Sequence, residues 1–168
     1  VIGVLSKDFD NVNDAVNVMK DFGSNVEDAI SIGLGAGDNK QAKVVSEIAK
    51  HYQGSHINQV FTSVGQTFAN SGNTTWVNSL VSPSGKPGYV NISTGPISGA
   101  GKEQAVISIK AAINLIKDMG GSSIKFFPMN GLQTIEEYKA VAKACGEEQF
   151  GLEPTGGITL ENFEEILD

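Results

Sequence analysis

The sequence has 168 residues, enough for one domain with a sizeable core, and its 40% hydrophobic and 18% charged residues are typical of a globular protein. The net charge is −7 and all 12 basic residues are lysines, which argues against nucleic-acid binding, since that function needs clustered positive charge. The single Cys145 excludes an intramolecular disulfide. With no apolar run long enough to span a membrane, we expect a cytoplasmic protein without membrane partners.

Short apolar runs alternate with amphipathic stretches along the whole chain. The runs predict strands over residues 1–6, 29–34, 56–62, 76–81, 89–93, 123–127 and 150–154. The amphipathic stretches predict helices over residues 13–22, 40–52, 64–69, 104–117, 134–144 and 160–167, the fifth capped by Thr134 with Glu137 three residues on.

Repeated strand–helix units imply one α/β domain over 1–168, with a parallel sheet and right-handed crossovers. The sheet could be open and doubly wound or closed into a (β/α)₈ (TIM) barrel. Polar and glycine residues follow most strands, at 6–8, 35–38, 62–63, 93–96 and 155–157. In a barrel all these loops converge on one mouth, whereas in a doubly wound sheet only those near the switch point meet. The pattern therefore favours the barrel.

Lys125 stands in the middle of the short apolar strand predicted over 123–127. Burial of an ammonium lowers its pKa, and a neutral amine is a nucleophile, so Lys125 could form a Schiff base. The alternative is an edge strand whose lysine reaches out to water.

Two glycine loops follow predicted strands. Gly35-Ala36-Gly37-Asp38 completes neither a dinucleotide nor a P-loop pattern, and a tight turn with Asp38 as helix cap is the favoured interpretation. In the stretch 154–159, Gly156 and Gly157 precede a predicted helix, where backbone N–H groups attract anions. This second loop is either half of a phosphate site or a plain turn.

The stretches Ile-Lys-Phe-Phe-Pro at 124–128 and Pro-Thr-Gly-Gly-Ile at 154–158 resemble the 2-keto-3-deoxy-6-phosphogluconate aldolases (the KDPG/KHG family). Essentially the whole chain is similar to one divergent bacterial branch, the KDGP aldolases, associated with sugar-acid catabolism. The other stretches that carry this likeness are 33–38, 58–62, 78–83, 117–123 and 152–153.

The resemblance implies a metal-independent class I aldolase (a carbon–carbon lyase) on a (β/α)₈ barrel, without a cofactor and as a homo-oligomer. Lys125 matches the Schiff-base lysine, Thr155 a substrate-contacting threonine, and Gly156 and Gly157 the phosphate-binding pair. The implied reaction cleaves 2-keto-3-deoxy-6-phosphogluconate to pyruvate and glyceraldehyde 3-phosphate.

The chain departs from the family pattern at the second-strand glutamate base and at a neighbouring arginine, both of which are absent. Glu153 alternates to the same strand face as Thr155, so it is the candidate base; otherwise it pairs with a lysine or faces outward. Lys7 could replace the arginine as a point charge or could be a solvated loop lysine. A barrel also needs roughly 200–250 residues, so we expect the first and eighth strands to lie outside this chain.

Two other functions stay open: a phosphosugar isomerase or epimerase on the same fold, and a non-catalytic sugar-phosphate-binding barrel. His51 and His56 have no cysteine or acidic cluster at ligand spacing, so we expect no metal site and assign both to surface or capping positions. Trp76 is expected in the core or in a subunit contact.

Overall fold

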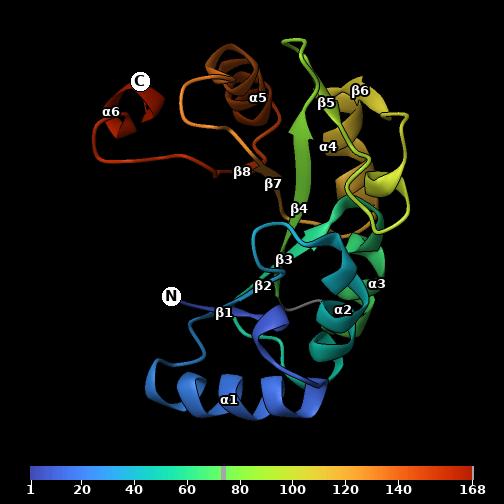
Figure 1. Cartoon of the computed structure of the whole chain (residues 1–168), viewed down its shortest axis with the longest axis vertical. Coiled ribbons are helices and arrows are strands. Elements are labelled where there is room, and N and C mark those ends of the chain that lie inside the picture. Colours follow the sequence, from blue (N-terminus) through green and yellow to red (C-terminus); the bar gives the residue numbers. More distant parts are fainter. Residues whose placement is uncertain (73–74, 168) are drawn as a thin grey trace.

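The computed structural model describes residues 1–72 and 75–167, which form eight strands and six α-helices around one mixed sheet (Figure 1). The strands are β1 (Ile2–Leu5), β2 (Ile30–Gly33), β3 (His56–Val60), β4 (Trp76–Pro83), β5 (Tyr89–Asn91), β6 (Val106–Ser108), β7 (Ser123–Phe126) and β8 (Gly151–Pro154). The helices are α1 (Val12–Asn25), α2 (Ala42–His51), α3 (Val64–Asn70), α4 (Ile109–Asp118), α5 (Ile135–Glu147) and α6 (Phe163–Leu167).

Six strands are parallel, in the order β1-β2-β3-β4-β7-β8. The far end of β4 pairs instead with β5, and β6 extends this antiparallel ribbon. Within the described residues β1 and β8 are the two edges of the parallel sheet and do not pair with each other, so this sheet is open. The parallel α/β architecture agrees with the sequence, and closure into a (β/α)₈ barrel stays a prediction.

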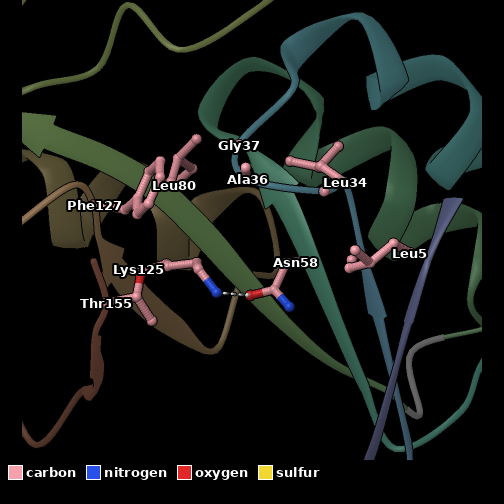
Figure 2. Close-up of a pocket in the computed structure, with 11 residues that line it drawn as sticks. Leu5, Leu34, Ala36, Gly37, Asn58, Leu80, Lys125, Phe127 and Thr155 are labelled. Atoms are coloured by element: carbon pink, nitrogen blue, oxygen red, sulfur yellow. Dashed lines mark hydrogen bonds between the residues drawn. The ribbon is translucent and has the colours of Figure 1, made fainter. Parts of the chain in front are cut away.

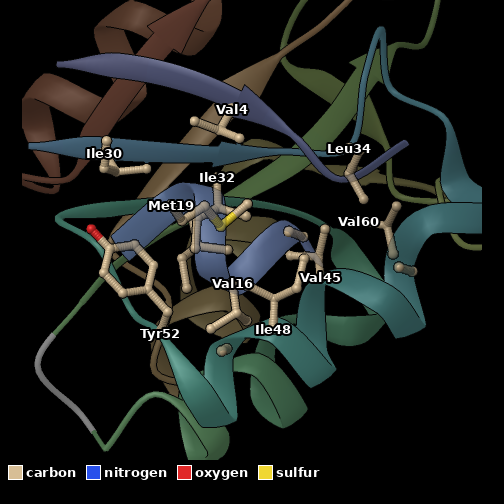
Figure 3. Packing of buried hydrophobic residues seen from close by; sticks show 14 of the residues in the cluster. Val4, Val16, Met19, Ile30, Ile32, Leu34, Val45, Ile48, Tyr52 and Val60 are labelled. Carbon is tan, nitrogen blue, oxygen red and sulfur yellow. The ribbon is translucent and has the colours of Figure 1, made fainter. Parts of the chain in front are cut away.

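The helix-facing residues of the sheet form two hydrophobic clusters. The first lies mainly among β1–β3, α1 and α2, where Met19, Ile32 and Ile48 are fully buried (Figure 3). The second lies mainly among β4–β8, α4 and α5, with Ile116 and Phe126 fully buried. Alternate residues of each strand point to the opposite face, which leaves a second set of side chains free for a site.

The helix predicted over 104–117 is corrected by the structure, because it begins only at Ile109. Val106 and Ile107 belong to β6, where their β-branched side chains suit the ladder with β5. The Ser108 side chain accepts a hydrogen bond from the Ala111 amide, which makes Ser108 the N-cap.

The capping arrangement predicted for α5 is also wrong. Thr134 occupies the N-cap position, but its hydroxyl donates to the Met129 carbonyl at 2.9 Å. The Glu137 carboxylate turns away from the helix start and accepts from the Ser84 and Gly85 amides. Both side chains that would cap the helix therefore make hydrogen bonds outside it instead.

The last helix begins at Phe163 rather than at residue 160. The Thr159 amide donates to Oδ1 of Asn162, and the Asn162 amide donates back to the Thr159 carbonyl. This closed turn, with Leu160 exposed, takes the place of the first predicted helical turn.

Candidate active site

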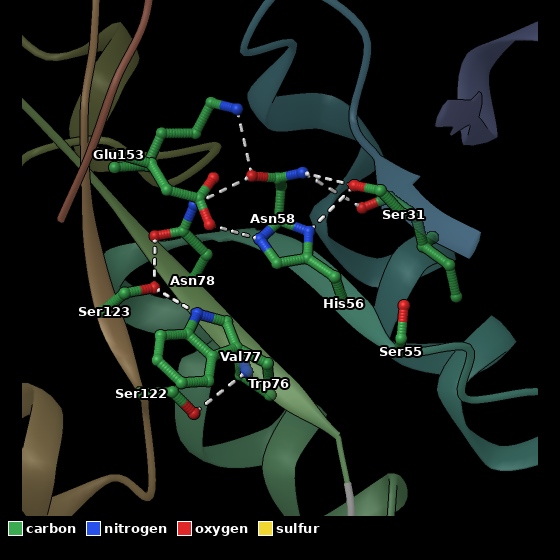
Figure 4. A network of polar contacts seen from close by, with 12 residues as sticks. Ser31, Ser55, His56, Asn58, Trp76, Val77, Asn78, Ser122, Ser123 and Glu153 are labelled. Atoms are coloured by element: carbon green, nitrogen blue, oxygen red, sulfur yellow. Dashed lines mark hydrogen bonds and ion pairs between the residues drawn. The ribbon is translucent and has the colours of Figure 1, made fainter. Parts of the chain in front are cut away.

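Polar side chains from five neighbouring strands meet on the sheet face opposite the two hydrophobic clusters. The strand register pairs Ser31 with His56, Asn58 with Asn78, and Lys125 with Glu153, so that alternate residues of each strand fall into rows. Hydrogen bonds join these side chains into one network (Figure 4). We call this set the polar cluster: Ser31, His56, Asn58, Asn78, Ser123, Lys125 and Glu153.

Lys125 lies half-buried in the polar cluster, and its Nζ donates to Oδ1 of Asn58 at 3.0 Å. Burial lowers the pKa of the Lys125 ammonium, and the nearby negative charge of Glu153 opposes this shift without reversing it. A lowered pKa raises the fraction of neutral amine at a given pH. Lys125 is therefore a more available nucleophile than an exposed lysine.

A cavity of about 170 Å³ lies directly beside Lys125 (Figure 2). Its wall is mostly apolar, with Leu5, Leu80 and Phe127 among the contributors, and its polar groups come from Lys125, Asn58 and Thr155. An apolar cavity with few converging polar groups is the usual form of a small-molecule site.

The turn Gly35–Gly37 closes one side of this cavity. Asp38 accepts from the Lys40 amide and so caps the short 3₁₀ turn before α2, which confirms its predicted capping role. A Cβ on Gly37 would come within 2.8 Å of the Phe127 ring, so the glycine permits the turn to pack against that side chain. The loop is both a turn and a cavity wall.

Thr155 lines the same cavity, and its Oγ1 is buried without a hydrogen-bond partner in the structure as described. A buried hydroxyl without a partner costs free energy, so it marks a place where a bound molecule could supply the missing hydrogen bond. This position fits the substrate contact that the resemblance implies for Thr155.

Glu153 is held by two neighbours and does not face outward. Its Oε1 lies 2.7 Å from Nε2 of His56, and its Oε2 accepts from Nδ2 of Asn78 at 2.7 Å. His56 has a side-chain exposure of only 17%, so its assignment to a surface or capping position is corrected, whereas His51 is 52% exposed at the end of α2. The sequence left open that Glu153 pairs with a lysine. Among the described residues Lys125 is its register neighbour, and the charge of Glu153 acts on the pKa of Lys125 rather than through a direct hydrogen bond.

Gly156 and Gly157 do not line the cavity beside Lys125. Both have positive φ, and the Gly156 carbonyl accepts from the Gly131 amide at 3.0 Å. A Cβ on Gly157 would clash with the Gly131 nitrogen. Close packing between the loops after β7 and β8 therefore already requires glycine here.

Lys7 is not among the residues that line the cavity, but it lies against Gly35, which is. The methylene stem of Lys7 runs close to Gly35, since a Cβ on that glycine would clash with it, while the side chain as a whole is exposed. Of the predicted site residues, the structure thus brings Lys125, Glu153 and Thr155 together. Lys7 reaches the rim, and the glycine pair lies one turn beyond Thr155.

Sequence reasoning missed His56, Asn58, Asn78 and Ser31 as members of the site. The sequence did carry a signal, which was a polar residue at every second strand position. His56 and Asn58 share one face of β3, and Ser123 and Lys125 show the same spacing in β7. Trp76 belongs to this face as well, since its Nε1 donates to Ser123 Oγ at 2.7 Å, although its side chain is substantially exposed.

Residues 1–72 and 75–167 contain neither a membrane-spanning helix nor a metal-binding cluster. No helix there has the length and apolar character needed to cross a bilayer. No group of three histidine, cysteine, aspartate or glutamate side chains is arranged to hold a metal ion in those ranges.

Comparison with known proteins places the chain in a class. The chain is 44% identical over 172 residues to a 2-dehydro-3-deoxy-phosphogluconate aldolase of Salmonella typhimurium (strain 14028s / SGSC 2262), an alignment covering 99% of this chain and 69% of that protein. The likeness defines the chain as an aldolase homologue, within the lyases. The family model described as KDGP aldolase matches residues 1–168, and the chain belongs to that family.

Proposed function

We propose that the protein is a class I aldolase in which Lys125 forms a Schiff base with a 2-keto acid. The observation that carries this proposal is the half-buried Lys125, with its lowered pKa, in a cavity also lined by Thr155, whose buried hydroxyl has no partner among the described residues. Class I chemistry needs a neutral amine at the carbonyl carbon, and burial raises the fraction of Lys125 in that form.

In the proposed reaction the Lys125 amine attacks the C2 keto carbon, and loss of water with uptake of one proton from solvent gives a protonated imine; the final hydrolysis returns that proton. The imine withdraws electrons from the C3–C4 bond. Glu153 takes the proton from the C4 hydroxyl, the C3–C4 bond breaks, and the aldehyde leaves. The carboxyl group returns its proton to C3 of the enamine, and water then hydrolyses the imine to release pyruvate. No metal is needed for any of these steps.

We propose 2-keto-3-deoxy-6-phosphogluconate as the substrate, with pyruvate and glyceraldehyde 3-phosphate as products. The name of the Salmonella relative supports this choice. Thr155 would contact the pyruvate half, Lys7 would replace the missing arginine at the substrate carboxylate, and the glycine pair 156–157 would meet the phosphate end. In the absence of arginine, the phosphate would be held by backbone amides and by lysine.

Borohydride trapping tests the proposal. Incubation with pyruvate and sodium borohydride should add a reduced pyruvate adduct to Lys125, detectable by mass spectrometry of the peptide, and Lys125→Met should remove both the adduct and cleavage activity. Lys117→Met is a matched control, since Lys117 is an exposed helix lysine. Cleavage activity that survives Lys125→Met without any adduct would overturn the Schiff-base mechanism. Activity retained in a metal chelator is expected.

A further inference from the structure

Glu153, the proposed base, is held at both of its oxygens. Oε1 lies 2.7 Å from Nε2 of His56 and Oε2 lies 2.7 Å from Nδ2 of Asn78. With one hydrogen bond to each oxygen, each still has a lone pair that could accept a proton. The carboxylate is thus fixed in position without being saturated.

The direction of these hydrogen bonds can be followed from Trp76. An indole N–H can only donate, so Ser123 Oγ, 2.7 Å from Nε1 of Trp76, must accept. The single proton of the Ser123 hydroxyl then donates to Oδ1 of Asn78 at 2.7 Å. The Asn78 amide is therefore oriented with Nδ2 toward Glu153, and its second N–H points to Oδ1 of Asn58 at 3.1 Å.

The same chain continues through Asn58 to His56. Because Asn58 Oδ1 accepts from both Asn78 and Lys125, its Nδ2 faces the other way and donates to Ser31 Oγ at 3.3 Å. Ser31 then has its own proton free for Nδ1 of His56, which lies 2.8 Å away.

The neutral imidazole accepts at Nδ1 and therefore carries its proton on Nε2, the nitrogen that faces Glu153. The opposite tautomer would set the Nε2 lone pair against an ionised carboxylate at 2.7 Å, with no proton between them.

We propose that His56 is a positioning residue for Glu153: its Nε2–H orients the carboxylate beside Lys125, and the hydrogen-bond chain that begins at Trp76 fixes this tautomer (Figure 4). The proposal rests on the function proposed above, in which Glu153 is the base. The glutamate base that the family carries on its second strand is absent here. Under this proposal Glu153 in β8 takes its role, and His56 in β3 and Asn78 in β4 hold it in position.

Two substitutions of His56 distinguish its role as a hydrogen-bond donor to Glu153 from the space that its side chain fills. His56→Leu removes the donor and should slow the exchange of the pyruvate methyl protons for deuterium, followed by proton NMR, by on the order of tenfold or more. His56→Gln, whose amide nitrogen reaches about the place of Nε2, should recover much of that rate. Borohydride trapping of pyruvate on Lys125 should persist in both variants, and His51→Gln, at the exposed end of α2, should change nothing.

The outcomes separate this inference from the proposed function. Absence of trapping in the unsubstituted protein would refute the Schiff-base function. If trapping is normal, three results would overturn the role of His56. The unsubstituted protein could show no exchange of the pyruvate methyl protons, or His56→Leu could exchange them as fast as the unsubstituted protein. The third result is a His56→Gln variant whose exchange is as slow as that of His56→Leu.

If the variants do not fold, nitrogen-15 NMR of the unsubstituted protein still decides. The neutral His56 ring should show the Nε2–H tautomer, with His51 as an exposed reference, and a dominant Nδ1–H form would contradict the inference.

Discussion

Lys125 imposes a cost on folding because its ammonium loses solvent without gaining a direct carboxylate hydrogen bond; the side-chain partner the structure gives it is the Asn58 amide oxygen. Since the folded pKa lies below the unfolded value of 10.5, the unfolded chain binds the proton more readily between these two values. Stability therefore rises with pH across that window, and the cost is fully present below it.

Lys125→Met should accordingly raise the melting temperature at pH 7, because it removes the buried charge and keeps the length of the side chain. The gain should shrink as the pH rises from the lowered pKa through 10.5, because well above that value the unsubstituted lysine is neutral in both states. Thermal unfolding followed by circular dichroism at pH 7 and pH 10 measures both effects. A lower melting temperature at pH 7 would contradict this account of Lys125.

Thr155→Val tests whether the unpartnered hydroxyl belongs to the ligand site. The substitution keeps the shape of the side chain and removes a buried polar atom, so the stability of the free protein should stay level or rise by about 1 kcal/mol. The pyruvate concentration that gives half-maximal trapping should increase several-fold. Ser79→Ala is the matched control: its hydroxyl is also buried and unpartnered, but it lies outside the cavity, so trapping should be unaffected.

At the scale of elements, Glu137 ties α5 to the turn that follows β4. Glu137 is buried, and its Oε2 accepts from the Ser84 amide at 2.7 Å and from the Gly85 amide at 3.0 Å. A carboxylate that accepts two backbone N–H groups contributes a strong pair of hydrogen bonds, and its removal leaves both donors without this partner.

Glu137→Ala should lower the free energy of unfolding by about 1–3 kcal/mol, measured by urea denaturation. Faster hydrogen exchange at the Ser84 and Gly85 amides would locate the effect in the turn. Glu137→Gln keeps an oxygen acceptor and should cost less, and Glu136→Ala, on the exposed side of the same helical turn, should cost almost nothing. Equal losses of unfolding free energy in Glu137→Ala and Glu136→Ala would refute the proposed link between Glu137 and the turn after β4.

The same scale shows how far the sequence predicts this protein. The alternation of apolar runs and amphipathic stretches predicted the parallel strands and the existence of all six helices, because these patterns depend on local periodicity. It misplaced the start of α4, since Val106 and Ile107 fit a helical face and a strand equally well, and only pairing with β5 decides between them.

The site was predicted in part for a similar reason. Lys125 stood out within its own stretch of sequence and Thr155 was implied by the family resemblance, whereas His56 gains its meaning from Glu153, which lies 97 residues further along the chain. Only the order β3-β4-β7-β8 brings these two side chains to one face. A pattern of polar residues at alternate strand positions indicates such a face, but not which residues on it pair.

At the scale of the whole molecule, the candidate site lies where two halves meet. The first hydrophobic cluster belongs mainly to elements before β4 and the second to elements from β4 onward. The β3–β4 ladder, with five register pairs, joins the halves, and the Asn58–Lys125 and His56–Glu153 contacts cross the same boundary. The geometry of the site therefore depends on both cores being folded at once.

We expect the two halves to unfold as one cooperative unit. Ile48→Ala in the first cluster and Ile116→Ala in the second remove fully buried side chains, and each should cost about 2–5 kcal/mol. If the boundary couples the halves, either substitution lowers hydrogen-exchange protection equally at the Ile32 and Ile124 amides, one in each core. Leu115→Ala, on the exposed side of α4, should change protection at neither amide. Loss of protection confined to the half that carries the substitution would show instead that the halves open separately, and the site would then be lost before the second core unfolds.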